Sequence, residues 1–259
     1  MKPAAWRSAL VTGAGSGIGR ALAIELARVG VGDVALCGRQ EAPLHEVARA
    51  VERHGARATV LVLDVTAAHA VDRLRSLDDA LGGLDLVIAN AGVGAGREHA
   101  PWAWETLRDA LHTNLCGAAA TLTANLEAMV RRGRGHLCGV GSLSGLGALP
   151  GSAAYCTPKA GLRMLLDCLR LDLAPRGVAV THLCLGFVRT AMVAASTHPL
   201  PQLLEPEAVA REASARLARR PREIVLPRAL GALVRAAAVP PGALRDALVL
   251  AAARRVPGA

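Results

Sequence analysis

Short apolar runs alternate with amphipathic stretches along most of the chain. The runs are almost continuously apolar, which is typical of strands covered on both faces of a parallel sheet. They predict strands at 8–12, 33–38, 58–65, 84–90, 136–142 and 179–185, and a weaker one at 224–226.

The amphipathic stretches between these runs predict helices. In 18–29, for example, Ile18, Leu22 and Leu26 recur at helical spacing on one face. The other predicted helices cover 42–54, 67–81, 102–132 and 152–174. This alternation predicts an α/β fold: a doubly wound, Rossmann-type, mostly parallel sheet of about seven strands with helices on both faces.

No break in composition divides the chain, so we expect a single Rossmann-type dinucleotide-binding domain over 1–259. The strand rhythm largely stops after residue 190. We expect a substrate loop and helix in 191–219, which is rich in proline, and a helical tail in 228–255, which is mostly Ala, Leu, Val and Arg.

Composition excludes several classes of protein. The chain has 259 residues, of which 52% are hydrophobic and 20% charged, so it can bury a core and global disorder is excluded. No run reaches the roughly 18 apolar residues of a membrane span, and the N-terminus does not resemble a secretory signal, so we expect a cytoplasmic protein. The net charge of +9 raises nucleic acid as a partner, but the arginines are dispersed and aromatic residues make up only 2%, so we predict no nucleic-acid binding.

Cysteine and histidine spacing predicts neither a disulfide framework nor a metal site. The six cysteines form no C-x-x-C pair and mostly lie in apolar runs, which predicts buried thiols in a reducing compartment. The eight histidines lack the H-x-x-x-H and H-E-x-x-H spacings of metal ligands.

A glycine-rich turn joins the first predicted strand to the first helix. It reads Thr-Gly-Ala-Gly-Ser-Gly-Ile-Gly from Thr12 to Gly19. Glycines let the backbone approach a pyrophosphate closely, and the following helix N-terminus supplies amide donors and a positive dipole. The turn therefore predicts a dinucleotide site, with Gly13, Ser16, Gly17, Ile18 and Gly19 as its residues.

A second group predicts acid–base chemistry. Tyr155, the only tyrosine, precedes Lys159 by four residues, so a helix places both on one face. A lysine ammonium there is expected to lower the pKa of the phenol and make it an acid–base group near neutral pH. Ser142 ends the fifth strand and can donate a hydrogen bond to a substrate oxygen; Ser144 is a less favoured candidate.

Together these motifs resemble the short-chain dehydrogenase/reductase family over about residues 6–192. That family has a Thr-Gly-x-x-x-Gly-x-Gly turn and a serine thirteen residues before Tyr-x-x-x-Lys, as here. The resemblance implies that Tyr155 donates and accepts the proton, that Lys159 tunes its pKa and binds the nicotinamide ribose, and that Ser142 orients the substrate. It also implies that Asn114 holds a proton-relay water.

The resemblance implies further cofactor contacts. Asp64 and Val65 match the pair at the adenine edge, and Thr190 matches the residue that caps the nicotinamide carboxamide. Ala89 and Leu185 depart from the family's Asn and Pro, and Pro158 stands inside the predicted active-site helix, which puts the Tyr155–Lys159 geometry at risk. The remaining implied cofactor residues are Asn90, Ala91, Gly92, Gly186 and Val188.

The second strand ends in Gly38-Arg39, without the acidic residue that usually holds the ribose 2′-hydroxyl of NAD. In the family, an arginine here binds the 2′-phosphate, so NADP(H) is favoured over NAD(H). Stacking of Arg39 on adenine is the alternative.

The predicted function is an NADP(H)-dependent oxidoreductase that interconverts a carbonyl and an alcohol on a lipophilic small molecule. Lipophilicity follows from the expected pocket walls in 93–97, 143–151 and 187–205, which are mainly apolar. Two alternatives stay open: an epimerase or multi-step redox enzyme of natural-product metabolism, and a non-catalytic cofactor-binding scaffold. We expect a homodimer or homotetramer. The Arg-rich apolar tail is expected to pack or oligomerise, and contact with a membrane surface is less favoured.

Overall fold

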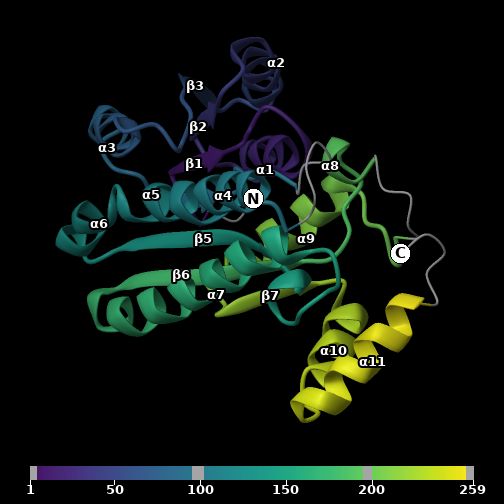
Figure 1. Cartoon of the computed structure of the whole chain (residues 1–259). Helices are drawn as coiled ribbons and strands as arrows, with labels where there is room; N and C mark the ends of the chain where they lie inside the picture. Colours follow the sequence, from purple (N-terminus) through teal and green to yellow (C-terminus); the bar gives the residue numbers. More distant parts are fainter. Residues whose placement is uncertain (1–4, 95–101, 195–199, 255–259) are drawn as a thin grey trace.

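The computed structural model describes residues 5–94, 102–194 and 200–254, without the side chains of 248 and 252–254. Parts of the expected pocket walls (95–97 and 195–199) and the last residue of the predicted tail lie outside the described residues. Seven parallel strands form one sheet in the order β3-β2-β1-β4-β5-β6-β7 (Figure 1). Their bounds are β1 Ser8–Thr12, β2 Asp33–Gly38, β3 Arg57–Val62, β4 Leu86–Ala89, β5 Gly135–Ser142, β6 Val178–Leu185 and β7 Glu223–Leu226.

Helices cover both faces of this sheet, as the sequence predicts. On one face lie α1 (Gly17–Arg28), α2 (Glu41–Glu52) and α9 (Pro206–Leu217), whose leucines and valines join one core cluster. On the other lie α3 (Ala70–Ala80), α5 (Ala118–Thr123), α6 (Leu126–Arg132) and α7 (Ala153–Leu173). The inner strands β1, β2, β4, β5 and β6 are largely buried between these layers, which explains their nearly continuous apolar sequence, whereas the edge strand β3 is mostly half-buried or exposed.

The helix predicted over 102–132 is several pieces in the structure. It consists of α4 (Trp104–Leu111), a π-helical turn over His112–Gly117, then α5 and α6. Gly117 packs against the loop that follows β3, since a Cβ on Gly117 would lie 2.6 Å from Val65 Cγ2. The π turn carries Asn114, and such turns often mark functional positions because they change which side chains face inward.

Helix α7 runs without interruption through Pro158. The amides of Tyr155 and Cys156 donate to the carbonyl of Ser152 at 3.0 and 2.8 Å, so the first helical turn forms before the proline is reached. Pro158 is buried one turn into the helix, where only a single backbone donor is lost. Tyr155 and Lys159 therefore keep the helical spacing that the proline put at risk.

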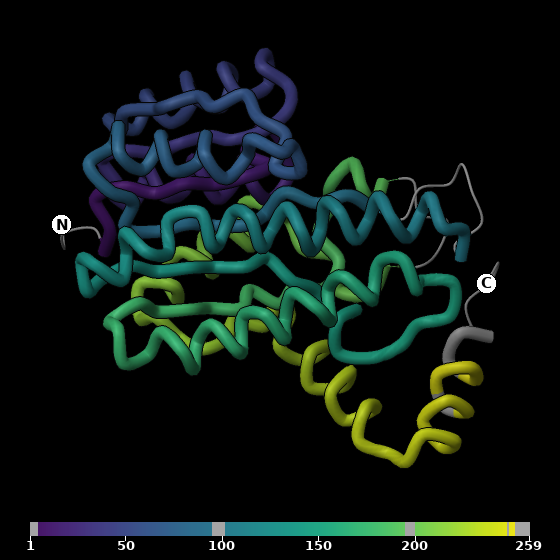
Figure 2. The backbone as a smooth tube through the Cα atoms, turned by 60° about the vertical axis from the view of Figure 1, so that its left-hand side comes forward, coloured from purple at the N-terminus to yellow at the C-terminus, as the bar shows by residue number. Residues whose placement is uncertain are grey.

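The tail forms two short helices, α10 (Arg228–Ala237) and α11 (Gly242–Arg254), after β7. Figure 2 shows α10 running outward from the sheet and α11 turning back beside it. Leu233 and Leu244 are 65% and 55% exposed on this arm. Within the described residues, none of the helices combines the length and apolar character required to cross a membrane.

The prediction that the cysteines are buried is correct for only part of the set. Cys37, Cys138 and Cys184 lie inside strands and are buried, whereas Cys156 is half-buried. Cys116 and Cys168 are exposed because they lie on outward faces of the π turn and of α7. Burial inside an apolar run holds for strands covered on both faces and fails for helices with one solvent face.

Candidate active site

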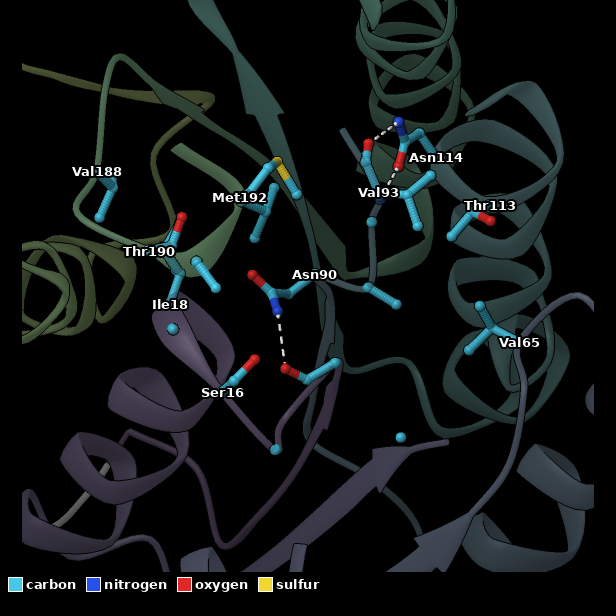
Figure 3. Close-up of a pocket in the computed structure, with 18 of the residues that line it drawn as sticks. Ser16, Ile18, Val65, Asn90, Val93, Thr113, Asn114, Val188, Thr190 and Met192 are labelled. Atoms are coloured by element: carbon cyan, nitrogen blue, oxygen red, sulfur yellow. Dashed lines mark hydrogen bonds between the residues drawn. The ribbon is translucent and has the colours of Figure 1, made fainter. Parts of the chain in front are cut away.

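A cleft of about 380 Å³ opens where the carboxyl ends of the parallel strands meet. Every predicted site residue except Gly19 lines it. Figure 3 shows part of this lining, with Ser16 at the N-cap of α1 near Asn90 and with Ile18 beside Thr190. The strands and the loops that follow them therefore bring together residues spread from Gly13 to Thr190.

The glycine-rich loop is locked to the end of β4. Gly13 has φ +64°, and a Cβ there would lie 2.9 Å from Ala91 Cα, so any side chain would displace the neighbouring backbone. Asn90 Nδ2 donates to the carbonyl of Thr12 at 2.9 Å, and Thr12 Oγ1 accepts from the amides of Asn90 and Ala91 at 3.1 and 3.2 Å. These hydrogen bonds form although Ala89 stands where the family has its first asparagine.

The start of α1 is suited to a pyrophosphate. Its N-cap, Ser16, makes no capping bond with its side chain, and its first turn has no acidic residue. The first amides of the helix are therefore open toward the cleft, where an anion is favoured. Together with the glycine cradle, this arrangement fits a dinucleotide.

Gly19 acts behind the loop rather than in the cleft. A Cβ on Gly19 would lie 2.2 Å from the carbonyl oxygen of Gly13 and 2.5 Å from Asn90 Nδ2. This glycine therefore permits α1 to pack against the loop. Gly19 was predicted to bind the cofactor; in the structure it does not line the cleft but supports the loop that does.

Arg39 and Asp64 lie together in the lining of the cleft. Arg39 Nη1 is 3.9 Å from Asp64 Oδ2, and their side chains are 66% and 42% exposed, so the pair is weak and the guanidinium remains accessible. Asp64 Oδ1 accepts from the amide and hydroxyl of Thr66 at 2.9 and 2.7 Å. These bonds, aided by Arg39, lower the pKa of Asp64 and keep it charged.

Ser142, Tyr155 and Lys159 converge in the middle of the cleft. Ser142 and Lys159 are 8% and 6% exposed. Lys159 Nζ donates to the carbonyl of Val140 at 2.9 Å and lies 5.8 Å from the centre of the Tyr155 ring. A hydrogen bond also links Ser142 to Tyr155, whereas Ser144 only donates its amide to Ser142 Oγ at 3.1 Å. Ser142 rather than Ser144 is thus the serine beside the phenol.

The predicted lowering of the Tyr155 pKa is wrong for this structure. Burial raises the pKa of Tyr155, and the hydrogen bond with Ser142 offsets only part of that rise. The cause is loss of hydration around the phenolate. Burial also lowers the pKa of Lys159 to about 8.

Asn114 holds the segment that follows β4. Its Nδ2 donates to the carbonyl of Val93 at 2.9 Å, and its Oδ1 accepts from the Val93 amide at 2.8 Å (Figure 3). This two-point contact fixes the cleft wall beside Gly92. The water-holding role implied by the family resemblance stays a prediction.

Several residues of the cleft were not predicted. Gln40, Pro43 and Leu44 line it beside Arg39, and Thr113 lines it beside Asn114. The sequence signal that could have indicated them is that they lie within a few residues of predicted site residues. Of the predicted apolar walls, Val93, Met192 and Val193 line the cleft, while the others do not: Leu143, Leu146, Leu149, Phe187, Leu200 and Leu203.

One cluster of metal-ligand types lies outside the cleft lining. Potential ligand atoms of His182, Cys184 and Glu223 lie within 4.8 Å of one another. Arg235 already pairs with Glu223, so a divalent cation there would meet a fixed positive charge. We therefore assign Glu223 to an ion-pair network, and the absence of a metal site stays a prediction.

Comparisons with known proteins agree with this geometry. Residues 7–200 match the family model described as short chain dehydrogenase. An oxidoreductase of Myxococcus xanthus (strain DK1622) is 43% identical over 257 residues, 99% of this chain and all of the relative.

Two solved structures share the fold and carry nucleotides. An alcohol dehydrogenase from Thermococcus sibiricus, complexed with 5-hydroxy-NADP, is 27% identical with a TM-score of 0.75, covering 85% of this chain and 95% of the other. A short chain dehydrogenase from Mycobacterium paratuberculosis, bound to NAD, is 26% identical with a TM-score of 0.72, covering 87% and 97%. With its parallel sheet, glycine loop and converging Ser, Tyr and Lys, this chain is an oxidoreductase of the short-chain dehydrogenase family.

Proposed function

We propose that this protein is an NADP(H)-dependent oxidoreductase that interconverts a carbonyl and an alcohol on a lipophilic small molecule. One observation carries the proposal. Ser142, Tyr155 and Lys159 line the same cleft as the glycine loop. A half-buried proton donor thus shares a cleft with a dinucleotide site.

The nicotinamide cofactor supplies or takes the hydride when bound, and the residues of the chain handle the proton. In reduction, Tyr155 Oη donates its proton to the substrate oxygen while the Ser142 hydroxyl holds that oxygen in place. The raised pKa of Tyr155 keeps the phenol protonated at neutral pH, ready to donate. Lys159, held by the Val140 carbonyl, places a positive charge near the phenolate that forms.

The accessible Arg39 guanidinium supports the preference for NADP(H). It directly follows β2, which ends in Gly38 and carries no acidic side chain at this position, and its pairing with Asp64 is weak. Known relatives of this fold have been solved with either nucleotide, so the side chain at this turn is the discriminating feature.

We expect Arg39→Ala to weaken NADPH binding far more than NADH binding. Loss of a charge-assisted contact to the 2′-phosphate is worth about 1.5–3 kcal/mol, or roughly 10- to 150-fold in Kd. Fluorescence titration with both cofactors measures this. An equal loss for the two would show that Arg39 contacts adenine or ribose instead.

Turnover should also depend on the ionisation of Lys159. The pKa of Lys159, about 8, lies below its usual value, so the ammonium is present below pH 8 and is lost above it. We therefore expect kcat/KM for reduction to be flat up to about pH 8 and then to fall about tenfold per pH unit. In Lys159→Arg, where the side chain stays charged, the fall in kcat/KM should begin at a higher pH. A wild-type profile flat to pH 9.5 would contradict this role.

The proposed activity is tested by NADPH consumption with a panel of lipophilic ketones and aldehydes, followed by product analysis. Val93, Met192 and Val193 supply an apolar wall for such substrates. Binding of NADPH without turnover of any carbonyl would favour the scaffold alternative, and product inverted at carbon without net redox change would favour the epimerase. We further expect a cytoplasmic homodimer or homotetramer.

A further inference from the structure

Helix α10 meets the two segments that follow the strands next to the catalytic residues. A Cβ on Gly186 would lie 3.0 Å from Pro227 Cδ, 3.3 Å from Leu230 Cδ2 and 3.4 Å from Leu143 Cδ1. Gly186 lines the cleft, and the buried Leu143 directly follows Ser142. The first turn of α10 therefore packs where the loops after β5 and β6 come together.

Gly231 sets how closely α10 approaches the sheet. It is buried, and a Cβ there would lie 2.2 Å from Val225 Cγ1 and 3.5 Å from Leu143 Cδ2. A contact of 2.2 Å forces a shift, and we expect the helix to move off β7 because the branched Val225 side chain has few alternative rotamers. The same displacement would move the helix away from Leu143.

An ion-pair network fastens the next turn of α10. Arg235 Nη2 donates to Glu223 Oε2, and Glu223 Oε1 lies 3.2 Å from Nδ1 of the buried His182. His182 and Glu223 are paired neighbours in β6 and β7. The hydrogen bond with His182, together with Arg235, lowers the pKa of Glu223 to about 2, so its carboxylate stays charged at neutral pH.

We propose that α10 positions the Ser142–Leu143 turn of the active site, with Gly231 and Arg235 as positioning residues that hold the helix against β7. Neither residue lines the cleft. They act through Leu143, whose Cδ2 lies 3.5 Å from where a Cβ of Gly231 would lie and whose backbone continues from Ser142. This inference rests on the proposed function, because that function assigns the substrate oxygen to Ser142.

The sharpest test adds and then removes a single steric contact. Gly231→Ala introduces the clash with Val225 Cγ1, and Val225→Ala in the same chain removes that atom, leaving a Cβ–Cβ distance of 3.5 Å, which is an ordinary contact. We expect Gly231→Ala to lower kcat about tenfold, since small displacements of positioning groups have effects of this size. The double variant should return to within about twofold of Val225→Ala alone.

Hydrogen exchange gives a readout that needs no substrate. In Gly231→Ala, amides in 140–148 should exchange faster, while those in 8–20 stay as in the wild type; the double variant should restore protection. The Kd for NADPH should change less than kcat does, because neither substituted residue lines the cleft.

The ion pair is tested separately. Arg235→Gln should reproduce the faster exchange in 140–148, and Arg235→Lys, which keeps the charge, should reverse part of it. Arg228→Gln is the matched control, because Arg228 is exposed on the same helix and forms no ion pair with the described residues. If Gly231→Ala does not fold, the Arg235 variants decide alone.

Wild-type exchange and kcat in both Gly231→Ala and Arg235→Gln would overturn the proposal. So would a loss in Gly231→Ala that Val225→Ala fails to restore, or an equal loss of NADPH affinity, which would indicate general damage. If the wild type reduces no carbonyl, the proposed function fails instead. The exchange data would still decide whether α10 holds the Ser142–Leu143 turn.

Discussion

Tyr155→Phe is expected to abolish turnover while leaving the cofactor site intact. The substitution removes only the phenolic hydroxyl, which is the proton donor of the proposed reaction and the partner of Ser142. Removal of a general acid lowers kcat about 10²–10⁴-fold. The measurement is steady-state NADPH consumption with a carbonyl substrate identified by the screen, at a pH below 8, where Lys159 is charged.

The control for this prediction is cofactor affinity. The phenyl ring of the variant would fill the same half-buried space, and the Gly13–Gly19 turn, where we propose that the pyrophosphate binds, is distant in sequence. NADPH titration should therefore give a Kd within about threefold of the wild type. More than about a tenth of wild-type kcat remaining would remove Tyr155 from the role of proton donor.

The sheet and most of the cleft could be predicted because strand patterning fixes topology, and topology fixes where strand ends meet. Once 8–12 and 84–90 are placed as parallel neighbours, the glycine turn and Asn90 must share one edge. The clustering of the site residues could therefore be predicted from strand topology without knowing any side-chain contact.

Energetic balances could not be predicted in the same way. Sequence spacing placed Lys159 beside Tyr155, but only the packed structure shows that burial raises the phenol's pKa and that the ammonium bonds to Val140. Whether charge or desolvation dominates depends on surrounding atoms that come from β5 and β6. The break of the 102–132 helix also could not be read from sequence spacing; its π turn carries Asn114, which bonds to Val93 from a distant part of the chain.

Long-range packing of the tail was also beyond the sequence. The apolar and basic residues of 228–255 predicted helices, but the composition fits packing, oligomerisation and lipid contact equally well. The structure places Leu230 and Gly231 against Leu143 and Gly186, so α10 is part of the body near the active site. The exposed leucines of α11 leave the expected oligomeric contact as a prediction.

Gly19→Ala is expected to destabilise the protein and to weaken NADPH binding, although helix propensity alone predicts the opposite sign. Gly19 lies inside α1, where replacing glycine by alanine favours the helix by about 1 kcal/mol. The new Cβ, however, would lie 2.2 Å from the Gly13 carbonyl oxygen and 2.5 Å from Asn90 Nδ2. Overpacking against backbone costs about 1–3 kcal/mol or more, so the clash outweighs the propensity.

The clash should also affect the cofactor site, because the displaced atoms of Gly13 and Asn90 belong to the glycine-rich loop and the residue that holds it. We expect Tm to fall by several degrees, at about 2–4 °C per kcal/mol for a chain of this size, and the Kd for NADPH to rise about 30-fold or more. Gly32→Ala is the matched control, since its Cβ would lie 3.5 Å from the Arg7 carbonyl oxygen, an ordinary contact, and it should change neither quantity. A higher Tm with unchanged NADPH affinity in Gly19→Ala would mean that α1 can move away from the loop, and that the close approach of Gly19 does not hold the cradle in shape.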